Sequence, residues 1–438
     1  MKTTAQELKS IIGECDIRDW ESLPTVSQER IAKANSADNF PSTIVYPSTV
    51  EDLARLMNYA HHQGWSVLPC GSGSKLGWGG VGKSVELVIS TERLNRVIDH
   101  AVGDLSVTVE AGVKFSDLQE ILLKTGQFLP LEPAYPQEAT LGGIIATADS
   151  GSLRQRYGGV RDMLLGISFV RSDGQIAKAG GRVVKNVAGY DLMKLFTGSY
   201  GTLGIITQVT LRVYPVPETA GTVTLTGQAE AIASVTKTLL SSTSTPTAVD
   251  LLSTGLVNQL GVGQGMGLMV RFQTVKDAVQ EQSSRLLEVG KQLGLTGSLY
   301  TDVEDAHLWQ SLPKQIWTTT HEQRITCKIG ILPTAAVTIL TKLDNLTSST
   351  GLALIHAGSG LGKLRLDAAK VDSQTIAELR NHCQSNSGFL TVLEAPLSLK
   401  QELDIWGYTS NALPTMRRLK QQFDPKNILS PGCFVGGI

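Results

Sequence analysis

Residues 69–80 read Pro69-Cys70-Gly71-Ser72-Gly73-Ser74-Lys75-Leu76-Gly77-Trp78-Gly79-Gly80, and this glycine-rich stretch decides the fold. It follows a strand-like run at residues 65–68 and leads through residues 81–84 into another at residues 85–90. Such a loop exposes consecutive backbone N–H groups with no Cβ in the way, which close approach to a phosphate or pyrophosphate requires. We expect it to run from strand to strand, with no helix after it.

Two familiar nucleotide-binding patterns fit this stretch poorly. The Rossmann pattern needs a third glycine and a helix, but Leu76 stands at the glycine position and no helical pattern follows. Residues 77–84 match the Walker A pattern literally, ending in Lys83 and Ser84. The strand before that match ends too early, and a buried strand rather than a helix is expected after it. A P-loop ATP-binding protein therefore remains a distant alternative.

Composition excludes several other classes. A chain of 438 residues predicts two or three domains, and its net charge of −1 argues against nucleic acid or an anionic membrane as partner. Apolar runs fall short of the ~20 residues of a membrane span, and the N-terminus has no signal-like apolar region. The five cysteines are scattered, which favours free thiols in a reducing, cytoplasmic setting and argues against an iron–sulfur cluster in this chain.

The first half of the chain predicts a mixture of helices and strands. A helix is expected over residues 50–62, opened by a Ser48/Glu51 capping box and closed by Gly64. A second is expected over residues 115–124, with Ser116 and Gln119 as its box. The expected strands are residues 66–68, 85–90, 106–110, 166–171, 175–178 and 204–214.

After Pro215-Val216-Pro217 the pattern changes to two similar runs of strands and helices. This order predicts one sheet with helices on a face. The expected strands are residues 222–226, 248–252, 268–272, 325–331, 352–356, 364–367 and 390–393. The expected helices are residues 229–240, 275–293, 335–346, 374–382 and, in the last segment, 413–423.

Further glycine clusters follow the first loop at residues 133–143, 157–162, 185–191 and 198–207. In this order and spacing they resemble the FAD-binding domain of the vanillyl-alcohol oxidase, or PCMH-type, flavoprotein superfamily. The tail, residues 423–432, is similar to the C-terminal signature of that superfamily. Residues 181–194, Gly-Arg-Val-Val-Lys-Asn-Val-Ala-Gly-Tyr-Asp-Leu-Met-Lys, most resemble the family of FAD-binding subunits of glycolate oxidases.

The resemblance implies an α+β fold in which a PCMH-type FAD-binding domain of two α+β subdomains carries an α+β cap domain. It implies an N-terminal helical extension at 1–39, the FAD-binding domain at 40–217 and the cap, for substrate or partner, at 218–396. The C-terminal segment, 397–438, is expected to pack back on the FAD-binding domain.

The resemblance also implies which residues bind non-covalent FAD. Residues matching the pyrophosphate loop are Gly71, Ser72, Gly73, Ser74 and Lys75, where Lys75 either adds a charge-assisted contact or is solvated. Residues matching the segment beneath the flavin, and its extensions, are Thr140, Gly142, Gly143, Gly151 and Gly158. Ile205 and Ile206 match the strand whose backbone meets the adenine end.

Two departures from the superfamily pattern affect the chemistry. Members that attach FAD covalently use a histidine or cysteine, whereas this chain has Ser74 and Lys75 in the first loop and Ala134 and Tyr135 in the second segment. The catalytic hydroxy-acid dehydrogenases of the superfamily carry a motif with two histidines that help to bind a divalent metal. Residues 356–363 are the matching stretch of this chain. The first histidine, His356, remains, but Lys363 replaces the second. Because an ammonium offers no lone pair, we expect no metal site.

The resemblance implies an FAD-dependent oxidoreductase, the FAD-binding subunit of a glycolate oxidase that oxidises a small 2-hydroxy acid. A separate catalytic flavin subunit and an iron–sulfur subunit would be its partners, and membrane association would be peripheral and through them. The catalytic candidates are Arg182, Lys185 and Tyr190. A self-sufficient FAD-dependent dehydrogenase or oxidase and a flavin-bearing scaffold without turnover are alternatives.

Overall fold

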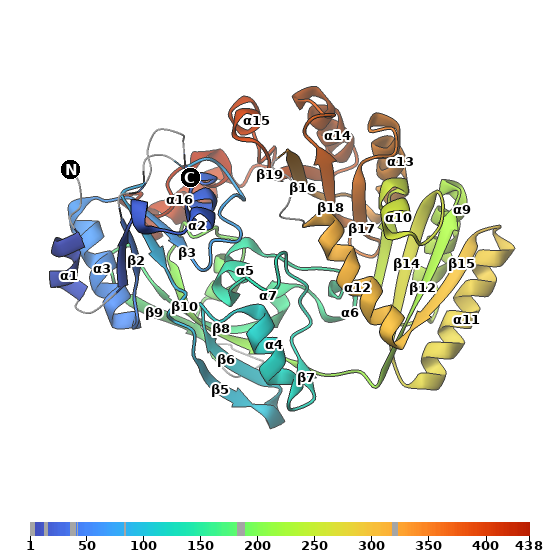
Figure 1. Cartoon of the computed structure of the whole chain (residues 1–438), viewed down its shortest axis with the longest axis horizontal. Coiled ribbons are helices and arrows are strands. Elements are labelled where there is room, and N and C mark those ends of the chain that lie inside the picture. The colour runs from blue at the N-terminus through green and yellow to red at the C-terminus, as the bar shows by residue number, and fades with distance from the viewer. Residues whose placement is uncertain are drawn as a thin grey trace. The chain divides into compact units, whose positions relative to one another are not determined.

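The computed structural model describes residues 5–12, 16–35, 41, 43–82, 85–181, 189–317 and 323–438. The chain forms two compact units (Figure 1). Unit 1 comprises residues 1–151, 158–216 and 408–438, and unit 2 comprises residues 152–157 and 217–407. The boundary after Val216 lies in the Pro-Val-Pro segment, while residues 397–407 group with unit 2 and the rest of the C-terminal segment with unit 1.

The first sheet of unit 1 has the order β1-β2-β4-β3 and flanks the glycine-rich loop. Its strands are β1 (Asp16–Asp19), β2 (Thr43–Tyr46), β3 (Val67–Cys70) and β4 (Leu87–Ser90). β3 and β4 run parallel, with the loop between them, and residues 71–82 contain no helix, as predicted. The first 39 residues are not purely helical, because β1 lies between α1 (Ala5–Ile12) and α2 (Thr25–Ala32) and pairs with β2.

Helix α3 (Val50–Gln63) packs its apolar side on this sheet and ends at Gly64 in the left-handed conformation, as predicted. Its cap differs from the prediction. The N-cap is Thr49 rather than Ser48, and its hydroxyl accepts from Asp52 N at 3.1 Å. Helix α4 (Phe115–Leu123) begins after Lys114 without a side-chain cap, so the Ser116/Gln119 prediction was wrong.

The second sheet of unit 1 is antiparallel, with the order β5-β6-β10-β8-β9. Its strands are β5 (Val97–Ala101), β6 (Ser106–Glu110), β10 (Ile205–Arg212), β8 (Leu164–Val170) and β9 (Ile176–Gly180). β10 is central, and all of its residues except Gln208 and Arg212 are buried. The sequence did not predict α5 (Leu141–Thr147), which packs on β10 and contains Gly142 and Gly143 of the glycine cluster.

The C-terminal helix α16 (Leu413–Phe423) is held in unit 1 by a buried lysine. Lys420 Nζ donates to Thr202 O at 3.0 Å, to Leu429 O at 2.7 Å and to Asp424 Oδ2 at 2.7 Å. Burial lowers the pKa of Lys420, while Asp424 opposes this shift. The tail therefore joins the segment of Thr202 to β3, because Leu429 also bridges to Val67.

Unit 2 is one antiparallel sheet of eight strands, in the order β15-β12-β14-β13-β17-β18-β16-β19. The strands are β12 (Thr219–Gly227), β13 (Ala248–Leu252), β14 (Met266–Thr274), β15 (Thr296–Thr301), β16 (Arg324–Gly330), β17 (Leu352–His356), β18 (Leu361–Asp367) and β19 (Phe389–Glu394). One face forms an apolar core with α9 (Ala229–Leu240), α11 (Lys276–Gln292), α13 (Ala336–Leu346) and α14 (Ser373–Ser385). This confirms the predicted single sheet with helices on a face.

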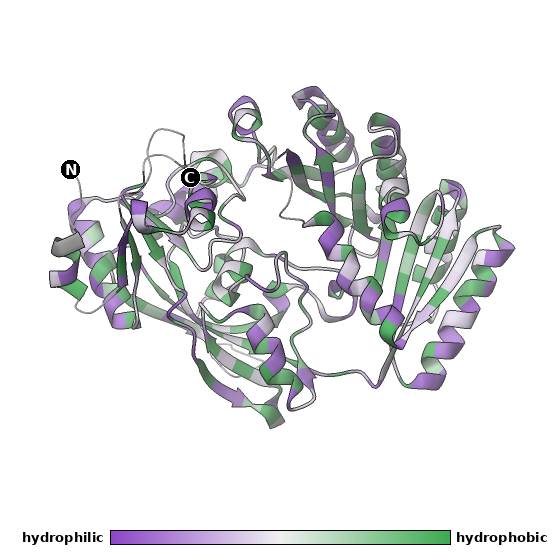
Figure 2. Cartoon of the chain, in the orientation of Figure 1, coloured by the Kyte–Doolittle hydropathy of each residue, from purple (hydrophilic) through white to green (hydrophobic). Residues whose placement is uncertain are grey.

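The opposite face of this sheet is polar and is partly covered by α12 (Asp302–Ile316), which the sequence did not predict. Thr222 accepts from Trp309 Nε1 at 2.7 Å and donates to Asp305 Oδ1 at 2.6 Å, which fastens the helix to β12. The alternation of apolar and polar residues along the strands is visible in Figure 2. Unit 2 thus has one face built for packing and one that presents charged groups.

Candidate functional site

The loop after β3 is held open by its own turns and by a neighbouring segment. Gly73 adopts φ +76°, a left-handed conformation that favours glycine, and its carbonyl accepts from Leu76 N at 3.2 Å. Ser72 Oγ donates to Glu138 O at 2.7 Å, which fixes the loop to the segment before α5. Further along, Gly80 N donates to Cys433 O at 2.9 Å, so the tail closes the far end.

Three successive backbone donors in this loop face no acceptor among the described residues. Among the residues that the structure describes, no carbonyl or side chain accepts from the N–H groups of Ser72, Gly73 and Ser74. The first turn of α5 behaves differently, since Leu141 N and Gly142 N donate to Val113 O and Ala111 O. The donors available for an anion therefore lie in the loop rather than at the helix.

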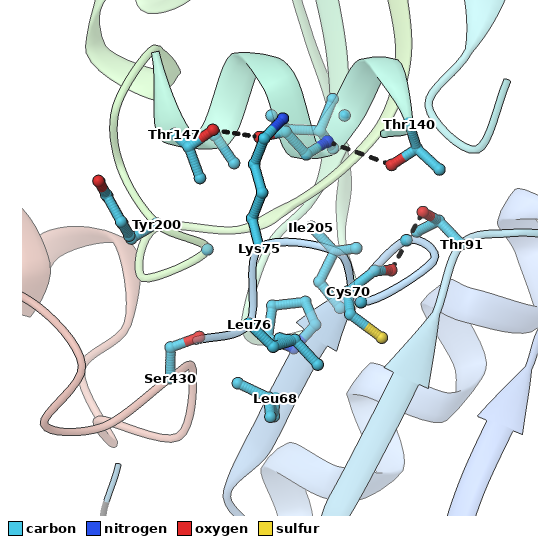
Figure 3. A pocket seen from close by; sticks show the side chains of 18 of the residues that line it. Leu68, Cys70, Lys75, Leu76, Thr91, Thr140, Thr147, Tyr200, Ile205 and Ser430 are labelled. Carbon is cyan, nitrogen blue, oxygen red and sulfur yellow. Dashed lines mark hydrogen bonds between the residues drawn. The ribbon is translucent and has the colours of Figure 1, made fainter. Parts of the chain in front are cut away.

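The loop forms one wall of a cavity of about 870 Å³, a volume that includes its open mouth (Figure 3). The other walls come from α5, the start of β10 and the C-terminal tail. Of the predicted cofactor-binding residues, the structure brings ten together around this cavity: Gly71, Ser72, Gly73, Ser74, Lys75, Thr140, Gly142, Gly143, Ile205 and Ile206.

The glycines that line the cavity lack a side chain for different reasons. A Cβ on Gly71 would lie 2.1 Å from Thr140 Oγ1, and one on Gly142 would lie 2.9 Å from Ala111 Cβ. These two glycines are required by packing within the chain. A Cβ on Gly143 would meet Thr140 Oγ1 at 3.3 Å and nothing closer, so its missing side chain leaves space on the cavity side of α5.

Lys75 is not solvated, and its ammonium is not available to an anion alone because it is already paired with Asp149. Its side chain is 6% exposed, and Nζ lies 3.2 Å from Asp149 Oδ2, whose side chain is 1% exposed. Asp149 also accepts from Ala134 N at 2.6 Å, and the Lys75 ammonium lies 5.6 Å from the Trp78 ring centre. This buried pair joins the loop, the segment of Ala134 and the end of α5, and sequence reasoning did not predict it.

Two predicted cofactor residues lie outside the cavity lining. A Cβ on Gly151 would approach Glu132 Cβ to 2.4 Å, and Gly158 has φ +82° beside Asp162. Packing and a tight turn thus account for both glycines. The catalytic candidates Arg182 and Lys185 lie outside the described residues, as does Lys83 of the Walker-like match. Tyr190 is 88% exposed and does not line this cavity.

Several lining residues were not predicted, and some carry unusual backbone or thiol chemistry. Tyr200 lies in the glycine-rich turn before β10 with φ +53°, and burial raises its pKa, with Asp149 adding to the effect. Strained residues of this kind cluster at functional sites. Other unpredicted lining residues with a hydroxyl or thiol are Cys70, Thr91, Thr147, Ser430 and Cys433. Tertiary packing brings these residues to the cavity, so the sequence alone did not indicate them. The glycines around Tyr200 were a pattern that could have indicated its place in the site.

Residues 356–363 lie in unit 2, where His356 and Lys363 are both buried. His356 Nδ1 lies 2.6 Å from Asp250 Oδ1, and the two residues are 4% and 0% exposed. Lys363 is 8% exposed, and its ammonium lies 4.8 Å from the centre of the Trp317 ring. Within the described part of the chain, no group of three or more His, Cys, Asp or Glu residues could hold a metal ion. His356 is a hydrogen-bonded histidine.

Comparison with known proteins identifies the class of protein to which this chain belongs. Residues 41–180 match the FAD binding domain family. The mitochondrial D-lactate dehydrogenase (cytochrome) of Arabidopsis thaliana is 27% identical over 431 residues, covering 92% of this chain and 74% of the relative. Glycolate oxidase subunit GlcD of Bacillus subtilis is 34% identical over 185 residues, which cover 42% of this chain and 39% of that relative. The chain is an FAD-dependent oxidoreductase.

Solved structures show the fold of this oxidoreductase. An alkyldihydroxyacetonephosphate synthase superposes with a TM-score of 0.72 at 18% identity, covering 97% of this chain and 84% of that one. A substrate-bound p-cresol methylhydroxylase superposes with a TM-score of 0.72 at 14% identity, covering 98% and 95%. Together with the match of residues 41–180 to the FAD binding domain family, these neighbours confirm the predicted α+β architecture with a PCMH-type FAD-binding domain. None of the described helices is long and apolar enough to span a membrane.

Proposed function

We propose that this oxidoreductase is a dehydrogenase of small 2-hydroxy acids, with its FAD in the cavity beside the glycine-rich loop. The observation that carries the proposal is the run of three N–H donors at Ser72, Gly73 and Ser74, which have no acceptor among the described residues, beside a cavity lined by ten of the predicted cofactor-binding residues. Relatives named as D-lactate dehydrogenases, matched over most of the chain, support the substrate class.

The residues around the cavity fit FAD. Consecutive backbone donors suit the oxygens of a pyrophosphate, because they supply hydrogen bonds without a desolvated side chain. Gly143 leaves room for a flat ring against α5, and the apolar side chains of Ile205 and Ile206 lie among the lining residues. Bound FAD supplies the two-electron acceptor for oxidation of an alcohol carbon, while the chain binds, orients and excludes water.

We propose that the attachment is non-covalent. Cys70 lines the cavity, but burial raises the pKa of its thiol to about 12, which leaves little thiolate near neutral pH. Ala134, at the position where a linking cysteine occurs in other members, is fully buried and donates its N–H to Asp149. Neither segment therefore presents an activated nucleophile.

We further propose that the chain is the FAD-binding subunit of a glycolate oxidase complex, with separate flavin and iron–sulfur subunits. The match to a glycolate oxidase subunit supports this arrangement. The described cysteines, Cys70, Cys327, Cys383 and Cys433, are dispersed over both units, so electrons leaving the flavin need an external acceptor. A self-sufficient dehydrogenase is the second candidate, favoured by the length of the match to D-lactate dehydrogenases.

The experiment starts from purified protein. Acid precipitation should release a yellow supernatant, and added FAD should stabilise apoprotein by about 2.7 kcal/mol at a hundredfold excess over its dissociation constant. Anaerobic mixing of holoprotein with D-lactate or glycolate then follows flavin bleaching. We expect slow bleaching by the chain alone and rapid bleaching in the complex. Rapid bleaching alone would favour the self-sufficient enzyme, and absence of bound flavin would refute the proposal.

A further inference from the structure

Two residues that line the cavity of unit 1 hold a backbone conformation that side chains other than glycine rarely adopt. Tyr200 has φ +53° and Ser430 has φ +44°. They belong to segments far apart in the sequence, the turn before β10 and the C-terminal tail, and Figure 3 labels both around the cavity. Such a conformation is strained and persists only where neighbouring contacts hold it. The contacts that hold these two residues therefore help to determine the shape of the cavity wall.

One buried ammonium group fastens both segments beside these strained residues. Lys420 Nζ donates to Leu429 O, the carbonyl next to Ser430, at 2.7 Å. It also donates to Thr202 O, in the turn that contains Tyr200, at 3.0 Å. Lys420 itself does not line the cavity. A single side chain from α16 thus joins the two segments that carry the strained wall residues.

Asp424 completes this arrangement, and we call Lys420 and Asp424 the clasp. Asp424 Oδ2 accepts the third N–H of Lys420 at 2.7 Å, and their side chains are 7% (Lys420) and 0% (Asp424) exposed. The carboxylate also accepts from Ile428 N at 3.1 Å and from Leu429 N at 2.8 Å. An ammonium has three N–H donors, so each donor of Lys420 has an acceptor. A neutral side chain at position 420 would leave these buried acceptors without their donor.

Helix α16 is docked by contacts that do not involve the clasp. The ring centre of Phe423 lies 5.9 Å from that of Phe196 and 6.4 Å from that of Phe169. Ser172 Oγ donates to Phe423 O at 2.9 Å. These contacts should keep the helix in place when the ammonium is removed. The change should then be confined to the tail and to the turn of Tyr200.

We propose that Lys420 is a positioning residue for FAD, because the clasp holds Tyr200 and Ser430 in the strained conformations that shape one wall of the cavity. Lys420 acts through these two residues. The proposal rests on the proposed function for the location of FAD in this cavity. It adds that a buried residue of the C-terminal helix determines how tightly the cavity holds its cofactor.

The test is a fluorescence titration of full-length apoprotein with FAD. Lys420→Met keeps an unbranched side chain and removes the ammonium, so we expect the dissociation constant of FAD to rise at least about tenfold, since charge-assisted hydrogen bonds are lost. Phe423→Leu is the matched control, because it loosens the packing of the same helix and leaves the clasp intact. It should lower the free energy of unfolding and leave the dissociation constant unchanged.

A second substitution tests whether strain is the link between the clasp and the cofactor. Glycine adopts positive φ without strain, so Ser430→Gly added to Lys420→Met should restore part of the lost affinity. If Lys420→Met does not fold, Asp424→Asn takes its place in both measurements, since it removes the charge and keeps an oxygen acceptor. Normal FAD affinity in the clasp variant, an equal loss in Phe423→Leu, or no recovery with Ser430→Gly would each overturn the proposal.

A parallel titration of Gly143→Val keeps this test separate from the proposed function. Loss of FAD in Gly143→Val but not in Lys420→Met retains the cavity and refutes the clasp. Loss in Lys420→Met that Ser430→Gly reverses, with normal binding in Gly143→Val, retains the clasp and moves the flavin away from α5. A holoprotein that no 2-hydroxy acid reduces would refute the proposed substrate class and leave this result unchanged, because the titration measures binding alone.

Discussion

Two glycine-rich turns of this chain look alike in sequence and differ in what their backbone does. In the loop at residues 71–80, the N–H groups of Ser72, Gly73 and Ser74 have no acceptor within the described chain. In the turn at residues 356–360, Ala357 N donates to Val249 O, and Gly360 N donates to His356 O at 2.8 Å. The first turn leaves its donors for a ligand, and the second uses them.

Glycine content alone therefore does not indicate a phosphate site. A Cβ on Gly358 or Gly360 would collide with atoms of the chain, so those glycines serve close packing. A Cβ on Gly73 meets nothing closer than 3.3 Å, and the residue is required by its positive φ. The useful distinction is whether the backbone donors that glycine exposes are already satisfied.

The largest expected effect comes from Gly360→Ala in the packed turn. The new Cβ would lie 1.9 Å from a backbone oxygen at φ +68°, so the turn must move, and we expect a loss of about 3 kcal/mol in the free energy of unfolding of unit 2. Urea unfolding followed by circular dichroism measures it. FAD bound per folded molecule should not change, because unit 1 contains the cavity.

Gly103→Ala is the control for this variant, because a Cβ on Gly103 meets no atom within 4 Å. Its unfolding free energy should change by less than about 0.5 kcal/mol. A Gly360→Ala protein as stable as this control would show that the turn tolerates a side chain, and the contrast between the two turns would fail.

In the open region, Gly143→Val should affect the cofactor rather than the fold. The side chain would project from α5 into the cavity, where we place FAD, and we expect the dissociation constant to rise about a hundredfold, equivalent to about 2.7 kcal/mol. Fluorescence titration of apoprotein with FAD measures it. Gly73→Val should likewise lose FAD, because a branched residue does not adopt φ +76° readily.

Gly142→Ala separates packing from binding at the neighbouring position. Its Cβ would lie 2.9 Å from Ala111 Cβ, so the main consequence should be a loss of stability of unit 1. If Gly143→Val retains normal FAD content while Gly142→Ala loses it, the cofactor lies elsewhere than on the cavity side of α5.

Much of the fold was predictable because buried faces leave a pattern in the sequence. Apolar residues alternate with polar ones along strands and recur at helical spacing along helices. Strands β13 and β17 and helix α16 were predicted with the same bounds that the structure shows. Helix α12 and strand β15 were missed, since β15 is an exposed edge strand without an apolar face and α12 packs on a polar one. Helix α5 was hidden by its own glycines, which weaken helix propensity but suit close packing on Ala111.

The sequence predicted the backbone segments that form the candidate site, but it did not predict how the charged side chains of the site pair. The family resemblance carried by the glycine clusters implied ten of the lining residues, since glycines that allow close approach of the backbone mark those segments in the sequence. The Lys75–Asp149 pair joins positions 74 residues apart, and neither residue indicates a partner in a single sequence. The same holds for Asp250 and His356, which are opposed by strand register alone.

The smallest expected effect concerns Lys83→Ala, at the end of the Walker-like match. A P-loop needs a helix after its lysine, whereas the next element here is β4, parallel to β3. The proposed phosphate donors are backbone groups of residues 72–74, so removal of this side chain should change the FAD dissociation constant less than twofold. Equilibrium dialysis with FAD and with ATP measures both ligands. Tight ATP binding that this substitution abolishes would make the loop a nucleotide triphosphate site, and the contrast between an open cofactor loop and a packed turn would need another explanation.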